Sequence, residues 1–252
     1  MLFFERILNS KPGGVKEQRR ATRYAVGSSF PIKAMLNLLG RDEFGQQLAS
    51  ADGRGWNWAG KLVNFSSNGV SIQLPPAVIA KKGDSTLLIL TLAGYQLNIP
   101  CHVVHVRPHP DSVQFGLKFD FPDKNTPAGF QQLLELVAFG ASLKPEKPHS
   151  AAPDASGYMV EHYHGDFDSR LTVWRPAAGG AVLWFEFHLA TYCVRGDTGA
   201  RTLEFAADEG KETKPVTPAQ VGEIHQLFKW VVPNIARAVP SDVRQSLQSF
   251  AA

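Results

Sequence analysis

Two short groups of residues in the N-terminal half have side chains suited to holding a planar anion. They are Arg19, Arg20 and Arg23, followed along the chain by Asn64, Ser66 and Gly69. An arginine guanidinium donates paired hydrogen bonds to phosphate or to the O6 and N7 atoms of guanine, and it stacks on a base. An asparagine amide oxygen accepts N–H donors, and a serine hydroxyl both donates and accepts. Glycine tolerates a positive φ and the close approach of a ligand.

The spacing within each group sharpens this hypothesis. Arg19 and Arg23 are four residues apart on a segment ahead of the first predicted strand. They could therefore close on a ligand from one side, with Arg20 as an auxiliary phosphate contact. The stretch 64–69 taken alone also fits a plain turn, because Asn and Ser hydrogen-bond to nearby backbone groups.

Basic residues are concentrated at the start of the chain. The net charge is +3, yet residues 1–23 carry +4 and the remainder carries −1. A basic segment this short cannot neutralise the many phosphates of a nucleic-acid duplex, but it can hold a small anion. A solvated basic tail is the alternative interpretation, and residues 1–18 are predicted to be a basic N-terminal segment.

Short apolar runs separated by turn signals occupy residues 31–119, a spacing typical of an antiparallel sandwich or a small barrel. The runs are Pro31–Leu39, Trp56–Val63, Gly69–Leu74, Ser85–Leu92, Tyr95–Val106 and Ser112–Phe119. Thr126 and Pro127 then have the types of an N-cap and a first helical residue. Apolar residues follow at helical spacing up to Ala141, so a helix should close this domain with one face on the sheet.

A second β-rich region follows residues 143–157, which contain three prolines, have no periodicity and are predicted to be an extended linker. Thr217 and Gln220 have the spacing of a capping box, and Pro233 should kink or end the helix that they begin. A last short helix is expected from Ser241 to Phe250. The apolar runs before these helices, typical of an antiparallel meander, are Tyr158–His164, Arg170–Trp174, Ala181–Leu189, Tyr192–Arg195 and Arg201–Ala206. The predicted domains are 19–142 and 158–252.

Taken in order, the two polar groups match the RxxxR and [D/N]xSxxG elements of a known family. Arg19–Arg23 is followed by the apolar start Tyr24–Val26, and Asn64–Gly69 is followed by Gln114–Phe119 and a helix. Residues 19–141 thereby resemble the PilZ family. The resemblance implies a six-stranded antiparallel β-barrel with a C-terminal helix. It also implies a ligand, cyclic di-GMP, which is a bacterial second messenger with two guanines and two phosphates. The residues implied to bind it are Arg19, Arg20, Arg23, Asn64, Ser66 and Gly69. The expected fold class is mainly β: this barrel plus a second α+β domain, a meander followed by helix.

One departure from the family pattern affects the predicted site. Forty residues separate Arg23 from Asn64, more than is usual in the family, and the excess lies in the polar stretch 40–55. An inserted loop there could cover the site or contact a partner. It also leaves open whether the arginines still reach the turn.

Histidines and cysteines offer two alternative sites for a metal ion. Cys101, His102, His105 and His109 cluster in sequence, but strand alternation would place Cys101 and His105 on the face opposite to His102. In the second domain, a three-histidine site is possible if the strand with His162 and His164 neighbours the strand with Glu186 and His188. A polar outer sheet face, which would include Trp174 and Trp184, is the simpler interpretation. No metal site is predicted.

Composition and motifs exclude several classes of protein. No apolar run approaches the roughly 18 residues of a membrane helix, and the N-terminus lacks the features of a secretory signal. Cys101 and Cys193 are expected to be reduced and buried, in agreement with a cytoplasmic protein. The chain has no Walker-type loop, G-x-S-x-G elbow or H-E-x-x-H motif, so an enzyme is not expected.

The sequence therefore predicts a non-enzymatic, cytoplasmic receptor for cyclic di-GMP, with no other cofactor. Binding at the barrel would rearrange a C-terminal output domain that meets an unknown protein partner. The alternatives are a PilZ-like interaction scaffold that binds no nucleotide, as a homodimer or with a stable partner, and a metal-dependent function of the second domain. Nucleic acid is not an expected partner, because residues 158–252 carry a charge of −2.

Overall fold

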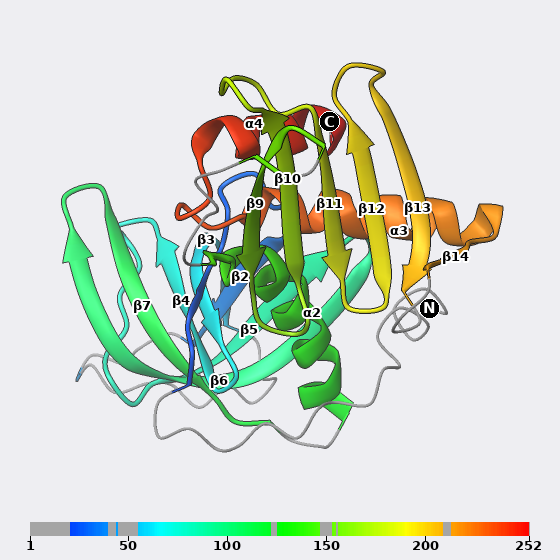
Figure 1. Cartoon of the computed structure of the whole chain (residues 1–252). Coiled ribbons are helices and arrows are strands. Elements are labelled where there is room, and N and C mark those ends of the chain that lie inside the picture. Colours follow the sequence, from blue (N-terminus) through cyan, green and yellow to red (C-terminus); the bar gives the residue numbers. More distant parts are fainter. Residues whose placement is uncertain are drawn as a thin grey trace. The chain divides into compact units, whose positions relative to one another are not determined.

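The computed structural model describes residues 21–39, 44, 55–121, 125–146, 153–154, 156–208 and 213–251. The chain divides into two compact units (Figure 1). The first comprises residues up to Val26 and Pro31–Leu134, and the second comprises Gly27–Phe30 and Glu135–Ala252. The predicted domain boundaries at residues 18, 142 and 157 stay predictions.

The first unit is built on a closed antiparallel barrel of six strands, as predicted. Around the barrel the strands follow the order β3-β2-β5-β6-β7-β4, and β4 pairs back with β3. A short additional strand, β1, had not been predicted. It pairs with the C-terminal end of β3, at Asn64 and Phe65. The strands are β1 (Tyr24–Ala25), β2 (Lys33–Leu38), β3 (Trp56–Ser66), β4 (Gly69–Leu74), β5 (Ser85–Leu92), β6 (Tyr95–His109) and β7 (Ser112–Phe119).

The barrel core follows from strand alternation, which turns every second side chain inward. Leu36, Ile72 and Leu88 are completely buried inside it. The helix α2 (Asn125–Ala141) contributes Phe130, whose ring lies 5.6 Å from that of Phe65 in an edge-to-face contact. The predicted closing helix is thus confirmed, and the residues of α2 up to Leu134 pack with the barrel.

Two β-bulges change which residues face outward. The register shifts between Leu62 and Asn64 in β3, and between Val103 and His105 in β6. An extra residue in one strand reverses the alternation of everything beyond it. His105 is therefore exposed and pairs with an outward-facing residue of β7, whereas Cys101 is buried. The expectation that Cys101 and His105 share a face is wrong for this reason, and burial raises the pKa of the Cys101 thiol to about 12.

The second unit contains a seven-stranded antiparallel sheet in sequential order from β8 to β14, the predicted meander with one added strand at each end. Three helical segments follow it: α3 (Pro218–Val231), the 3₁₀ turn η1 (Val232–Asn234) and α4 (Ser241–Ala251). The strands are β8 (Lys144–Pro145), β9 (Tyr158–His164), β10 (Arg170–Pro176), β11 (Trp184–Leu189), β12 (Tyr192–Asp197), β13 (Thr202–Asp208) and β14 (Thr213–Pro215).

The helices cover one face of this sheet. Phe185 of β11 stacks on Phe228 of α3, with ring centroids 6.0 Å apart, and meets Phe250 of α4 edge to face. Alternate residues of β11, among them Trp184 and Glu186, point to the opposite face. The outer face thus carries the polar and aromatic side chains that the sequence predicted for it.

Local signals place the helices of the second unit where they were expected. The Thr217 hydroxyl accepts the N–H of Gln220, and the Gln220 side chain accepts the N–H of Thr217, which completes the capping box. The helix α3 ends at Val231, just before η1 with Pro233. Asn234 then accepts the N–H of Gly27 through its side-chain oxygen at 2.8 Å and donates to the Trp230 carbonyl.

Two further expectations concern the thiols and the membrane. Cys101 and Cys193 are both free and buried, as predicted. Within the described part of the chain, no helix is long and apolar enough to cross a membrane.

Candidate functional site

The structure places Arg23 of the first predicted group beside Asn64 of the second, on the outer face of the barrel. The strand β1 pairs with the end of β3, so that Tyr24 lies opposite Phe65 and Ala25 opposite Asn64. Arg23, two residues before Ala25, is exposed and is the diagonal cross-strand neighbour of Asn64. Its Nη1 donates a long hydrogen bond of 3.5 Å to Oδ1 of Asn64. Arg23 and Asn64, 41 residues apart in sequence, are therefore in contact.

The long stretch between these elements does not prevent the contact, because it is the connection between the neighbouring strands β2 and β3. Asn37 secures its base by exchanging two hydrogen bonds of 3.0 Å with the backbone of Gly55. The predicted covering role of residues 40–55 lies outside the described residues, apart from Phe44 and Gly55, as do Arg19 and Arg20.

Ser66 occupies the turn between β3 and β4 rather than an open surface. Its residue is only 2% exposed, and its hydroxyl lies 3.0 Å from both the Gly69 carbonyl and the Asn68 amide oxygen. The hydroxyl thus closes the turn that follows Asn64 by two residues.

Gly69 is required by the neighbouring backbone, not by a positive φ. A Cβ atom at this position would lie 2.3 Å from the carbonyl oxygen of Leu117 in β7. The β4–β7 pairing places Gly69 opposite Lys118, at the point where the barrel closes. The expectation of a left-handed glycine is wrong, because the close approach of β7 is what excludes a side chain.

Strand register reveals further residues of this face that the sequence analysis missed. Asn64 pairs with Ser71, Ser71 with Gly116 and Gly116 with His105, so one row of small and polar residues crosses four strands. Both bulges adjoin this row and turn its end residues outward. No sequence signal marks Ser71 or Gly116, because their membership depends on pairing between distant strands.

Cations line the same face on either side of this row. Lys118 lies opposite Gly69, and the row Lys61, Gln73, Gln114 and Arg107 runs parallel to the first. Lys61, Arg107 and Lys118 are exposed. Together with Arg23 they make this outer face basic, which suits a ligand with several negative charges.

The second unit places a different cluster on its outer sheet face. Nε2 of His188 lies 2.6 Å from Oε1 of Glu186 and 3.9 Å from the Cys193 sulfur, and Oε2 of Glu186 accepts a 2.6 Å hydrogen bond from Arg195. The His188 bond, then the Arg195 bond, hold the pKa of Glu186 at about 2 against the effect of burial.

This cluster is arranged as an ion-pair network. Glu186 and Cys193 both face the same ring nitrogen of His188, whereas a nucleophile–base–carboxylate triad uses both nitrogens. Two ligands of one zinc ion at about 2.0 Å would lie about 3.3 Å apart, farther than the 2.6 Å contact between His188 and Glu186. The strand β10 separates His162 from Glu186, so the three-histidine site considered from the sequence is not formed.

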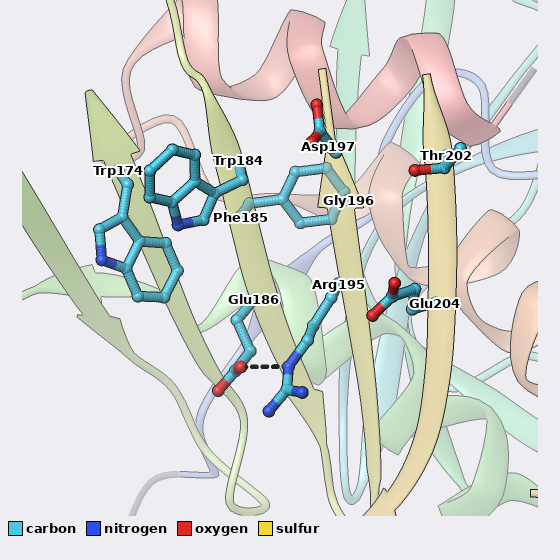
Figure 2. A pocket seen from close by; sticks show the side chains of 9 residues that line it. All are labelled: Trp174, Trp184, Phe185, Glu186, Arg195, Gly196, Asp197, Thr202 and Glu204. Atoms are coloured by element: carbon cyan, nitrogen blue, oxygen red, sulfur yellow. Dashed lines mark hydrogen bonds and ion pairs between the residues drawn. The ribbon is translucent and has the colours of Figure 1, made fainter. Parts of the chain in front are cut away.

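A pocket opens on the same outer face (Figure 2). Trp174 and Trp184 stand side by side, and Asp197 lies next to Trp184 on the neighbouring strand. The Glu186–Arg195 ion pair lies in the adjacent cross-strand row, which continues to Glu204. Trp174 and Trp184 were assigned from the sequence to a polar outer face, but their convergence with Glu204 was not predicted.

Comparison with known families identifies the first unit. Residues 17–139 match the family model of the PilZ domain. None of the curated proteins matches the chain. Solved structures that match it align with about half of the chain, each at low identity. The PilZ domain of YcgR from Escherichia coli with c-di-GMP is 12% identical, and the match covers 47% of this chain and 89% of that chain with a TM-score of 0.36. The MrkH–c-di-GMP complex of K. pneumonia is 17% identical, with 48% of this chain and 52% of that chain covered and a TM-score of 0.35. YcgR from Escherichia coli in complex with c-di-GMP is 12% identical, with 47% of this chain and 45% of that chain covered and a TM-score of 0.34.

Replacing Gly69 by alanine should weaken the barrel at its point of closure. Because the new methyl group would meet the Leu117 carbonyl, β7 must move, at a cost of about 1–3 kcal/mol in free energy of unfolding. Gly222→Ala on α3 is the control, since its Cβ would meet no atom within 4 Å and should stabilise the helix by about 0.5–1 kcal/mol. Urea unfolding measures both, and equal effects would contradict the assigned role of Gly69.

The Glu186 network should stabilise the second unit in a pH-dependent way. The folded-state pKa of about 2 is below the ordinary 4.5, so the stabilisation is present above pH 4.5 and is lost as the pH falls towards 2. Urea midpoints of the wild type and Glu186→Gln should therefore differ more at about pH 5 than at about pH 2.5. Glu223→Gln on α3, outside the network, serves as the control. A difference that does not change with pH would contradict the prediction.

Proposed function

With residues 17–139 forming a PilZ domain, we propose that this chain is a non-enzymatic receptor for cyclic di-GMP. The observation that carries the proposal is the contact between Arg23 and Asn64, one residue from each of the two family motif elements. In this proposal the protein binds the nucleotide and changes conformation in response, without catalysing a reaction.

The charges of the outer barrel face support a nucleotide with two phosphates. Arg23, Lys61, Lys118 and Arg107 share this face. The Arg23 guanidinium can pair with phosphate or with the O6 and N7 atoms of a guanine, and the Asn64 amide oxygen can accept the N–H groups of a guanine. In the proposal Arg19 and Arg20 complete this set from the segment just before Arg23.

The shape of the face supports a planar ligand. Between Asn64 and His105 the row continues through Ser71 and Gly116, which carry a small side chain and none. Ser71 is buried and accepts the Gln114 amide, whereas Gly116 is partly exposed, so in the proposal a base approaches the strands at Gly116, with the turn of Ser66 and Gly69 at the edge of the site. In this proposal Ser66 and Gly69 position the site, and Arg23 and Asn64 contact the ligand.

The covalent chain offers a route from this site to the second unit. Gly27, four residues after Arg23, belongs to the second unit, where it donates to the buried Asn234. A Cβ atom on Gly27 would lie inside contact distance of the Pro233 carbonyl, so this segment is tightly held. Ordering of the arginine segment by the nucleotide would pull on residues 24–27 and thereby bias the second unit, which is the proposed output domain.

Calorimetric titration of the full chain with cyclic di-GMP, at two salt concentrations, tests the binding. Arg23→Ala should weaken binding by about 10- to 100-fold, since one bidentate guanine contact is worth about 1–3 kcal/mol. Lys82→Ala, an exposed cation in the β4–β5 connection, should leave the affinity unchanged. Binding to the wild type should weaken as salt increases.

Two results would contradict this account. Absence of heat and of a thermal shift at high cyclic di-GMP concentration would favour the interaction scaffold over the receptor. Binding with an affinity that Arg23→Ala leaves unchanged would remove Arg23 from the site.

Hydrogen–deuterium exchange tests the proposed route to the second unit. Saturating cyclic di-GMP should change the exchange of residues 27–30 and 230–236 in the wild type, because Gly27 is bonded to Asn234. In Asn234→Ala the response at 230–236 should disappear while nucleotide binding persists; Asn98→Ala, on β6, is the control. Identical exchange with and without ligand in the wild type would contradict the coupling.

A further inference from the structure

The pocket on the outer face of the second sheet combines aromatic and acidic walls. Trp174 and Trp184 are cross-strand partners on β10 and β11, with ring centroids 6.0 Å apart and planes at 27°. Tyr158 meets Trp184 edge to face at 4.6 Å. Three aromatic rings thus support one another on the face opposite to α3 and α4, and the Trp174 and Trp184 rings border the pocket (Figure 2).

The polar lining of this pocket is negatively charged. Three carboxylates, those of Glu186, Asp197 and Glu204, stand against one guanidinium, that of Arg195, which leaves a formal charge of −2. Arg195 is bonded to Glu186, and strand pairing places Arg195 directly opposite Glu204. Asp197 accepts two backbone N–H groups of the turn after β12, so its carboxylate is held in place beside the pocket.

Indole faces and carboxylates together select for a cation. The ring quadrupole of tryptophan attracts a positive charge above its face. A guanidinium suits this pocket better than an ammonium, because it is planar, weakly hydrated and able to stack on an indole while pairing with a carboxylate. The charge of −2 disfavours anionic ligands, including nucleotides, at this place.

From this geometry we infer that the pocket binds an arginine side chain presented by a partner polypeptide. The guanidinium stacks on the Trp174–Trp184 wall and pairs with Glu204, while Asp197 adds negative charge at the rim. The occupant is a polypeptide because the pocket is an open depression on the sheet, whereas free small ligands bind in sites that bury most of their surface. This inference goes beyond nucleotide binding and is independent of it.

Nuclear magnetic resonance of the full chain provides the test, since each tryptophan gives one indole N–H signal. The chain has five tryptophans, and Trp56, Trp58 and Trp230 do not line the pocket. Titration with a short peptide of glycine and serine around one arginine should shift the signals of Trp174 and Trp184 and leave the other three in place. The same peptide with citrulline, the uncharged isostere of arginine, should shift them far less.

Variants assign the interaction to its residues. Glu204→Gln should weaken arginine-peptide binding up to about fivefold, the range of a surface ion pair. Trp184→Leu should weaken it about tenfold, through loss of the cation–π contact. Glu223→Gln on α3 should change nothing, and an unshifted Trp230 signal shows that the fold of each variant is intact.

Three outcomes would overturn the inference. They are no shift of Trp174 or Trp184 at millimolar peptide, equal shifts with the citrulline peptide, and free arginine binding as tightly as the peptide. Either of the first two results would show that the pocket does not select a cationic side chain. The third would show that its ligand is a small guanidino compound and not a polypeptide. None of them bears on cyclic di-GMP, whose titration is separate.

Discussion

The close approach of β4 and β7 at Gly69 is the constraint on which the first unit depends. The Leu117 carbonyl occupies the space of a Cβ atom, so the barrel closes only where residue 69 has no side chain. Closure pairs β3 with β4 and fixes the turn in which the Ser66 hydroxyl meets the Gly69 carbonyl. Asn64 precedes that turn by two residues, and the pairing of β1 with β3 then places Arg23 beside it.

Register then decides what each sheet presents to solvent. In the barrel, bulges beside Asn64 and His105 interrupt the alternation and create a row of small and polar residues flanked by cations. In the second sheet the described pairs run without such shifts, so one face keeps its buried apolar residues under α3 and α4, together with the ion pairs of Arg175 with Glu161 and Asp242. The other face gathers Trp184 and Glu186. The same chemistry of alternation thus produces a basic surface in one unit and an acidic, aromatic one in the other.

One of the covalent connections between the two units lies close to Arg23. Arg23 belongs to the first unit, and four residues later Gly27 is bonded to Asn234 of the second. A ligand that orders the arginine segment would therefore act on a short, tightly held connection. The proposed arginine-binding pocket gives the second unit a surface through which such a signal could reach a protein partner.

Local information in the sequence determined much of the fold. Apolar alternation located the barrel strands and most of the meander, and Thr217, Gln220 and Pro233 set the limits of α3, because these signals act over a few residues. Arg23 and Asn64 were singled out by their resemblance to the PilZ motif elements, and the structure places them in contact. Tertiary structure alone decided that the bulges would expose His105, that Gly69 would face Leu117, and that Trp184 would line one pocket with Glu204. These features depend on which distant strands pair and in what register. The two-residue alternation of apolar side chains in the sequence does not specify the pairing partner or the register.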